Sequence, residues 1–471
     1  MAFFTQQWGL YTDYYELTMA QGYFYCGKKE ETATFYYFFR TNPYQGGFTV
    51  FAGLQDFLEM LTNFTFPRED IDYLRALGLK PEFLEYLSHF HFSGDIQSMK
   101  EGEIVFPGEP VLQVKGNIIE CQLIESLLLN ILNFESLIAT KAYRVKQVAG
   151  DRIFSDFGLR RAQGTGAVHG SRAAIIGGAS STSNVFAGKL FGIPVSGTQA
   201  HSWIQSFSGE LEAFQAFAQT HPENTVLLVD TYDTLHSGVP NAIKVGKEME
   251  KKGMHLRAIR LDSGDLAYLS KKARKMLDDA GLEKVKIIAS NQLNEHVIKS
   301  LLKDQEAAID AFGIGTEMIT GKNDAALDGV YKLSCLNDQP KMKFSENIEK
   351  ITLPGKKQVF RCLDQQGHFY RDAICLEDEK EQTVDRIYHP VYPERSTPIG
   401  KCSKEPLLNP VVRKGTVLTE EKTPAEIHHY LQERSSMLPD EHKRFISPHI
   451  YKVGISTKLM NTRNTLAKRL E

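Results

Sequence analysis

Several apolar runs in the middle of the chain end in polar, charged or glycine residues. Guanidinium, imidazole and carboxylate groups occur at these ends, and they can bind anions, transfer protons or coordinate a metal ion. This pattern is typical of a buried strand that is followed by residues that take part in catalysis or ligand binding. Six segments show it: IFSDFGLRR (153–161), PVSGTQAH (194–201), VLLVDTYD (226–233), RAIRLDSGD (257–265), KIIASNQ (286–292) and AFGIGTEM (311–318).

Arg160, Arg161 and Arg260 are the candidate anion ligands at these strand ends. A guanidinium group can contact a phosphate or carboxylate through two hydrogen bonds. Phe157 lies close to Arg160 in the sequence and offers a flat apolar face for an aromatic ring. We expect Arg160 to bind a ligand, whereas the simpler interpretation of Arg161 is a solvated side chain.

His201, Asp230 and Asp262 are the candidates for acid–base, phosphoryl or metal chemistry. An imidazole can act as a base or accept a phosphoryl group, although a lone histidine is often structural. Asp230 and Asp262 are one strand–helix unit apart, so they could meet and hold magnesium or sugar hydroxyls. Asp265 is better explained as the N-cap of the next helix.

Glycines in GIGT make a second candidate anion site. Gly313, Gly315 and Thr316 follow an apolar run, and glycine lets backbone N–H groups approach an anion closely. An ordinary tight turn is the alternative interpretation. GGASS (177–181), which lies between two predicted helices, is a weaker candidate of the same kind.

Strand and helix patterns alternate from Arg152 to about Lys332, which predicts parallel strands with right-handed crossovers. In a βα barrel the carboxyl ends of the strands meet at one face, where the active site lies. Six recognisable strands are fewer than the eight of a regular barrel, so we predict an irregular α/β barrel with an unidentified strand. A doubly wound open sheet is the alternative. The predicted helices are 171–177, 182–191, 203–219, 240–252, 266–280 and 294–303.

The chain outside this region predicts other structure. Residues 1–125 mix helical and strand patterns, as in an α+β domain, and the barrel is assigned to residues 126–340. Residues 341–376 alternate and turn at Pro354-Gly355 and Gln366-Gly367, which predicts antiparallel strands that return to the N-terminal domain. The remainder, to residue 471, predicts a peripheral region with a helix near 424–435.

Composition excludes several functional classes. The chain has 471 residues and a net charge of −3, which gives no reason to expect a nucleic acid or membrane partner. No apolar run reaches the roughly 20 residues of a membrane span, and no signal peptide is visible. Six scattered cysteines without a C-x-x-C pair fit a reducing cytoplasmic setting. The Walker, Rossmann and H-E-x-x-H motifs are absent.

Taken together, these motifs resemble those of nicotinate phosphoribosyltransferase, a member of the type II phosphoribosyltransferase group. The resemblance extends to about residue 376 and continues more weakly beyond it. It is carried by TDYYELTM, FFR, FGLRRAQG, SSTSNVFAG, GTQAHSW, VDTYDTLHSGVPNA, RLDSGDL, GIGT, GVYKL and PGKKQVFR.

The resemblance implies an activity. Such enzymes join nicotinate to phosphoribosyl pyrophosphate, which gives nicotinate mononucleotide and pyrophosphate in the first step of NAD salvage from nicotinate. The reaction uses magnesium and is coupled to ATP hydrolysis through a phosphorylated histidine, here His201. A homodimer with shared active sites is also implied, because the tyrosine that matches Tyr15 comes from the partner subunit in related enzymes.

The resemblance also assigns roles to residues of this chain. Tyr15 and Phe157 match an aromatic pair around the pyridine ring, and Thr198 and Arg260 match positions near nicotinate. Phosphate-binding residues are matched by Arg160, Gly315 and Thr316. Asp262 matches an aspartate on the ribose and metal side, and Asp230 a buried acidic residue that orients His201 or magnesium.

Asn184 matches a position where relatives that use nicotinamide carry an aspartate. An aspartate there would accept a hydrogen bond from a carboxamide but would repel a carboxylate. Asparagine removes the repulsion, so nicotinate is the expected substrate, and nicotinamide is the alternative.

Overall fold

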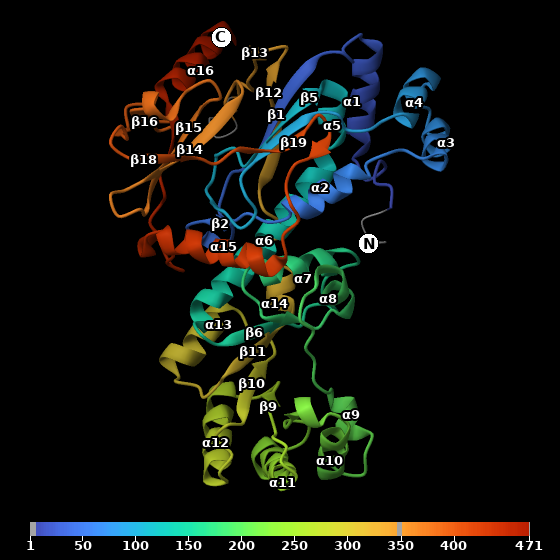
Figure 1. Cartoon of the computed structure of the whole chain (residues 1–471), viewed down its shortest axis with the longest axis vertical. Helices are drawn as coiled ribbons and strands as arrows, with labels where there is room; N and C mark the ends of the chain where they lie inside the picture. Colours follow the sequence, from blue (N-terminus) through green and yellow to red (C-terminus); the bar gives the residue numbers. More distant parts are fainter. Residues whose placement is uncertain (1–5, 346–350, 471) are drawn as a thin grey trace. The chain divides into compact units, whose positions relative to one another are not determined.

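The computed structural model describes residues 6–345 and 351–470, which form two compact units (Figure 1). Unit 1 comprises residues 1–140 and 326–471, and unit 2 comprises residues 141–325. The barrel region predicted from sequence, 126–340, is therefore wider than unit 2 at both ends. None of the helices in the described part of the chain combines the length and the hydropathy that a membrane span requires.

Unit 2 is built on a six-stranded sheet in which every pairing is parallel, as the alternation of strands and helices predicted. Its strand order is β7-β6-β11-β10-β9-β8. The strands are β6 (Ile153–Asp156), β7 (Ser181–Thr182), β8 (Val226–Leu228), β9 (Ala258–Leu261), β10 (Lys286–Ser290) and β11 (Ala311–Ile314).

One face of this sheet is covered by helices. Alternate strand residues, such as Phe154, Leu227 and Ile287, belong to two apolar cores that helical residues complete. The helices of this unit are α7 (Gly166–Ile176), α8 (Val185–Phe191), α9 (His201–Gln205), α10 (Glu210–Thr220), α11 (Val239–Glu250), α12 (Leu266–Asp279), α13 (Glu295–Lys299) and α14 (Thr316–Ile319). The Asp265 carboxylate accepts a hydrogen bond from Tyr268 N at 2.9 Å, which confirms the predicted N-cap.

The prediction of a strand at 194–201 was wrong. This segment makes an isolated parallel bridge between Thr182 and Val195, and the unidentified strand is β7, which begins within GGASS. Residues 195–199 nevertheless link the two edge strands. Ser196 N donates to Thr182 O in β7 at 3.0 Å, and Gln199 Nε2 donates to Val226 O in β8 at 3.1 Å. The sheet is thus connected around its open side by an irregular segment.

Unit 1 contains a seven-stranded sheet, a six-stranded sheet and a separate pair of short strands, together with the helices around them. The first is antiparallel, in the order β13-β12-β1-β5-β3-β19-β20, and the second has the order β17-β16-β21-β15-β14-β18. Aromatic and β-branched residues make β1 a buried central strand. The first sheet comprises β1 (Thr32–Phe39), β3 (Asp95–Ser98), β5 (Leu112–Asn117), β12 (Gly329–Leu336), β13 (Gln339–Pro340), β19 (Asn409–Arg413) and β20 (Thr416–Val417); β2 (Thr49–Val50) pairs with β4 (Ile104–Val105).

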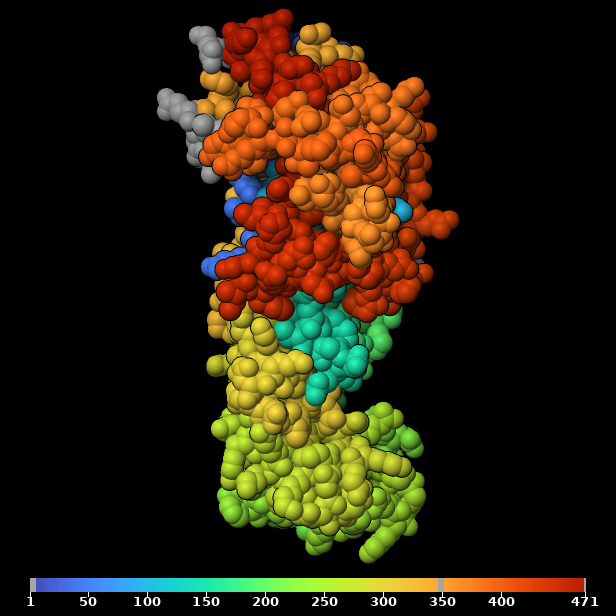
Figure 2. All heavy atoms as spheres, turned by 90° about the vertical axis from the view of Figure 1, so that its left-hand side faces the viewer, coloured from blue at the N-terminus to red at the C-terminus, as the bar shows by residue number. Residues whose placement is uncertain are grey.

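The C-terminal residues are an integral part of unit 1, which corrects the prediction of a peripheral region. They supply strands to both sheets, and their orange to red atoms form much of the face of this unit in Figure 2. The predicted hairpin is present as β14 and β15, which pair antiparallel, and the helix predicted near 424–435 is α15. Their bounds are β14 (Lys357–Leu363), β15 (Phe369–Leu376), β16 (Arg386–Tyr388), β17 (Ser396–Pro398), β18 (Ser403–Pro406), β21 (Val453–Ser456), α15 (Pro424–Met437) and α16 (Thr457–Leu470).

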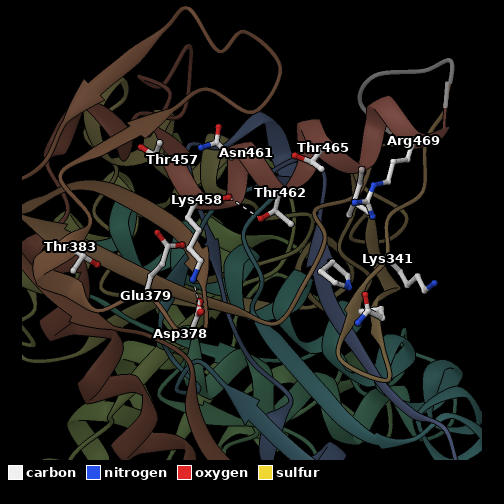
Figure 3. Close-up of a pocket in the computed structure, with 13 residues that line it drawn as sticks. Lys341, Asp378, Glu379, Thr383, Thr457, Lys458, Asn461, Thr462, Thr465 and Arg469 are labelled. Carbon is white, nitrogen blue, oxygen red and sulfur yellow. Dashed lines mark hydrogen bonds and ion pairs between the residues drawn. The ribbon is translucent and has the colours of Figure 1, made fainter.

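Helix α16 presents a polar face to a hollow of about 870 Å³ (Figure 3). Thr457, Asn461 and Thr465 follow one another at helical spacing along this face, and all are exposed. Lys458 is paired with Asp378 across the hollow. This surface has the character of a solvated helix face.

A buried ionic network joins the C-terminal residues to the N-terminal part of unit 1. Arg361 is fully buried and contacts Glu103 at 2.6 Å and Asp372 at 2.7 Å. Arg434, from α15, contacts the other oxygen of Glu103 at 2.8 Å, and Tyr451 donates to Asp372 at 2.9 Å. Four separate segments therefore meet around the Arg361 guanidinium group and the two carboxylates that it contacts.

The N-terminus of α1 (Tyr14–Tyr25) is attached to α6 (Glu125–Ala149) through a buried carboxyl group. Ser126 Oγ donates to Glu16 Oε1 at 2.6 Å, and Thr12 donates to the other oxygen. Burial raises the pKa of Glu16 to about 7, although these two hydroxyl groups oppose the shift. The remaining helices of unit 1 are α2 (Leu54–Thr62), α3 (Arg68–Ala76), α4 (Pro81–Ser88) and α5 (Ile118–Leu123).

Replacing Arg361 by methionine should destabilise the protein strongly. Removal of Arg361 from this buried ionic network leaves the carboxylate of Asp372 without its cationic partner and Glu103 with Arg434 alone, at a cost of about 3–5 kcal/mol. Urea unfolding of unit 1, followed by tryptophan fluorescence and circular dichroism, measures this cost. Arg68→Met is the matched control, because the Arg68 side chain is 94% exposed. Equal unfolding midpoints for the two variants would contradict the structural role of Arg361.

Glu16 should make stability depend on pH. The folded protein binds its proton more tightly than the unfolded chain does, because the pKa is about 7 when folded and about 4.3 when unfolded. Its contribution to stability therefore falls as the pH rises between these values. We expect Glu16→Gln to flatten the change in melting temperature from pH 5 to pH 8. The exposed Glu30→Gln control should keep the wild-type slope.

Candidate active site

The parallel register of unit 2 places one row of polar residues across the sheet. Ser181 pairs with Ser155, Ser155 with Gly313, and Gly313 with Ser290. Asp262 follows β9 at the next position, and the hydroxyl of Ser290 donates to its Oδ1. These residues alternate with those that pack against the helices, so they face the opposite side of the sheet, which we call the interior face.

Phe157 occupies the space above Gly313. A β-carbon at Gly313 would lie only 2.3 Å from the Phe157 ring, so a larger residue at this position would displace the ring. Phe157 N donates to Ile314 O at 2.8 Å, which extends the pairing of β6 with β11 past the end of β6. The half-buried ring therefore has a fixed position at the carboxyl edge of the sheet.

Arg260 projects from β9 on the interior face. Its Nη1 group donates to the hydroxyl of Thr198, and its buried Nε–H has no hydrogen-bond partner among the described residues. Burial lowers the pKa of Arg260, and the positive charge of Arg160 adds to this effect, whereas Asp262 and Asp230 oppose it. A guanidinium group with an unused buried donor is suited to binding an anion.

Asp230 and Asp262 lie together, as the sequence predicted. Asp230 Oδ2 accepts hydrogen bonds from Asp262 N at 2.8 Å and Ser263 Oγ at 2.7 Å. Its other oxygen, Oδ1, is buried and has no partner among the described residues. Asp262 is half-buried. The pair thus presents carboxylate oxygens that a cation or sugar hydroxyls could use.

His201 lies beside this pair. Its Nδ1 is 3.1 Å from the Thr231 hydroxyl, and its Nε2 is 3.9 Å from Asp262 Oδ2. If Nδ1 carries the proton and donates a hydrogen bond to the Thr231 hydroxyl, the lone pair of Nε2 is left free for nucleophilic attack. The side chain is 41% exposed, so a substrate can reach it.

Gly315 and Thr316 lie at the start of α14, directly after β11. Gly315 O accepts hydrogen bonds from Met318 N and Ile319 N, so the glycine begins this short helical turn. Thr316 is exposed, as are Arg160 and Arg161. The structure therefore leaves these side chains accessible at the carboxyl edge of the sheet.

Asn184 is placed differently from the expectation of a substrate contact. It is buried and caps α8, where its Oδ1 accepts from Ala187 N at 3.2 Å and its Nδ2 donates to Ala167 O at 3.2 Å. Both side-chain polar atoms are thus used within the protein, so its contacts favour a structural role. It belongs with Asp156, a buried carboxylate that Ser171 and Thr182 also contact.

The sequence interpretation did not single out Asp156, Ser290 or Thr231, although all three organise the site. Asp156 holds the turn after β6, since its Oδ1 accepts from Gly158 N at 2.8 Å. Strict alternation along the strands would have placed Asp156 on the helix-covered face and Ser290 on the interior face. Alternation cannot assign the residues of the irregular segment 195–199 to a face, because this segment is not a regular strand.

Tyr15 belongs to unit 1 and has a different environment. The residue is 47% exposed, and its hydroxyl is hydrogen-bonded to Glu125, which is 8% exposed. Burial, together with the charges of Glu125 and Glu16, raises the pKa of Tyr15. The hydroxyl is anchored while the ring face remains accessible, as a stacking platform requires.

Comparisons with known proteins agree with this arrangement. The model of the nicotinate phosphoribosyltransferase (NAPRTase) family matches residues 153–372, and models of its N-terminal and C-terminal domains match residues 10–133 and 356–463. The nicotinate phosphoribosyltransferase of Bacillus subtilis is 46% identical over 95% of this chain and 92% of its own. That of Homo sapiens is 33% identical over 97% and 96%.

A solved structure is similar over the same length. The crystal structure of human nicotinic acid phosphoribosyltransferase has a TM-score of 0.87 and 31% identity, and the similarity covers 97% of this chain and 99% of that one. The chain therefore matches this family in both sequence and fold, and the matched region includes the strands that carry the polar row on the interior face. The chain belongs to the nicotinate phosphoribosyltransferase family and is an enzyme of that type.

Proposed function

We propose that this enzyme transfers the phosphoribosyl group of phosphoribosyl pyrophosphate to nicotinate and thereby supplies NAD salvage. The observation that supports this most directly is the interior face of unit 2. An aromatic ring, a guanidinium group with a free donor and a pair of carboxylates share its carboxyl edge. The acid is favoured over nicotinamide, because Arg260 and the nearby charge of Arg160 attract a carboxylate.

In the proposed reaction the pyridine ring stacks on Phe157. The bond between C1 of the ribose and the pyrophosphate oxygen breaks, and its electron pair leaves with the pyrophosphate. The lone pair of the pyridine nitrogen then forms the new bond to C1. Asp230 and Asp262 can stabilise the positive charge that develops on the sugar, or hold its hydroxyls, and no protein nucleophile is required.

Magnesium fits the same residues. The Oδ1 of Asp230, which has no hydrogen-bond partner in the described part of the chain, and the half-buried carboxylate of Asp262 are hard oxygen ligands of the kind this ion prefers. Bound magnesium would neutralise charge on the pyrophosphate. Gly315 and Thr316 are proposed to contact the 5-phosphate, together with Arg160. Their accessibility at the carboxyl edge supports this assignment.

ATP coupling is proposed to use His201. Its Nε2 would attack the terminal phosphorus of ATP, the bond to ADP would break, and water would later release the phosphate from the imidazole. The hydrogen bond between Nδ1 and Thr231 supports this role, because it can hold the ring with Nε2 unprotonated. Tyr15 is proposed to complete the pyridine site of a partner subunit in a homodimer. Its anchored hydroxyl and exposed ring support that role.

Replacing Arg260 by methionine should weaken nicotinate use. Loss of a charged hydrogen bond costs about 1.5–3 kcal/mol, which corresponds to a roughly 10- to 100-fold rise in the KM for nicotinate. Initial rates with nicotinate, phosphoribosyl pyrophosphate and magnesium measure this change. The exposed Arg257→Met variant, three positions earlier in the chain, controls for loss of charge. If both variants kept the wild-type KM, the assignment of Arg260 would be wrong.

His201→Ala should abolish ATP coupling and leave slow uncoupled synthesis of the nucleotide. Because the imidazole is the proposed phosphoryl acceptor, γ-labelled ATP should leave acid-labile phosphate on the wild type but none on this variant. His236→Ala is the control, because the His236 side chain is 86% exposed. Equal labelling of the His201 variant and the wild type would refute the phosphohistidine.

A further inference from the structure

Three serine hydroxyls form a cluster on the interior face of unit 2. Ser155 Oγ lies 2.8 Å from Ser181 Oγ, which lies 2.7 Å from Ser196 Oγ, and Ser196 Oγ is 3.3 Å from Ser155 Oγ. We call these residues the serine cluster. Ser181 is more than nine-tenths buried, whereas Ser155 and Ser196 are half-buried. The cluster is therefore partly accessible at Ser155 and Ser196 and buried at Ser181.

The serine cluster lies next to the aromatic platform. Ser155 pairs with Gly313, the residue whose missing β-carbon makes room for the Phe157 ring. Phe157 follows Ser155 by two residues, so the two positions lie on the same face of the extended chain. An aromatic ligand could stack on Phe157 and direct a substituent along the interior face. That substituent would then lie next to these hydroxyls.

The cluster is also connected to the cationic part of the site. Ser196 and Thr198 belong to the irregular segment 195–199, and Thr198 accepts a hydrogen bond from Arg260. Hydroxyl donors therefore extend along this segment from the cluster to the guanidinium group. The cluster adds no charge of its own, so it supplies direction to an anion that Arg260 attracts.

Mutually bonded hydroxyls are suited to a carboxylate. Each hydroxyl can rotate and turn its O–H from a neighbouring oxygen to an incoming anion. Hydrogen bonds to an ionised acceptor are roughly twice as strong as neutral ones. A carboxylate would gain more from the cluster than a carboxamide of the same shape, because the amide is uncharged.

We propose that Ser155, Ser181 and Ser196 bind the carboxylate of the planar pyridine acid and contribute to the preference for acid over amide. This inference rests on the proposed function, since it assigns a subsite to the same reaction. It differs from the Asn184 expectation, because the discriminating groups are hydroxyl donors on the interior face rather than an amide at a helix cap.

The test is steady-state kinetics of the full-length enzyme with Ser155→Ala, Ser181→Ala and Ser196→Ala. Each change should raise the KM for nicotinate about tenfold, because one hydrogen bond to a charged group is lost. The KM for phosphoribosyl pyrophosphate should stay within about twofold. Inhibition by nicotinamide should weaken less than nicotinate binding, since its bonds to the cluster are neutral.

Two further variants separate this role from a structural one. Ser155→Thr keeps the hydroxyl and should retain most of the nicotinate affinity. Ser270→Ala removes a buried serine from α12 that bonds to Ala267 O and Ala308 N, so it should change thermal stability and leave the KM for nicotinate unchanged. If Ser181→Ala does not fold, the half-buried Ser155 and Ser196 variants still decide the question.

The outcomes distinguish the inference from the function on which it rests. A wild-type enzyme that does not convert nicotinate and phosphoribosyl pyrophosphate would contradict the proposed function. An active wild type whose three alanine variants keep their KM for nicotinate would overturn the serine cluster alone. A rise in the KM for phosphoribosyl pyrophosphate in place of that for nicotinate would also overturn it, because the hydroxyls would then serve the sugar donor.

Discussion

The common register of the six parallel strands of unit 2 determines where the chemistry of this protein can occur. Each strand alternates between the helix-covered face and the interior face, so residues at equal depth on neighbouring strands form a row. The row that contains Ser155, Gly313 and Ser290 ends beside Asp262. A one-residue shift of any strand would exchange its interior residue for one that packs against helices. The positions of the site residues therefore depend directly on the register of the strands.

Small and irregular elements complete what the regular strands begin. Gly313 leaves the space that the Phe157 ring occupies, and the segment 195–199 joins the edge strands β7 and β8. This segment also carries Ser196 and Thr198 toward the interior face. Ser196 and Thr198 are two positions apart, so this extended but irregular segment presents both to the same side. Regular strands thus fix the positions, and the irregular segment adds donors between them.

Unit 1 depends on a different constraint, the burial of a guanidinium group. Arg361 requires carboxylates from distant parts of the sequence, and the structure satisfies it with Glu103 and Asp372. Such a group is costly when unpaired, so the segments that supply its partners must fold together. This explains why the C-terminal residues are integrated with the N-terminal ones despite their polar composition. Glu16 and Glu125 are buried in this same unit, whereas Tyr15 beside them is exposed at its surface.

The sequence by itself determined the local features. Apolar runs that end in polar residues predicted five of the strands and the Asp265 cap, because strand period and capping are local properties. The tertiary structure alone decided which two-residue stretch became β7, that Asn184 faces helices, and that three separated serines meet. These outcomes depend on pairings between residues distant in the chain, which no local pattern encodes. The role of the C-terminal residues was hidden for the same reason, since a polar sequence does not reveal which buried charge it must satisfy.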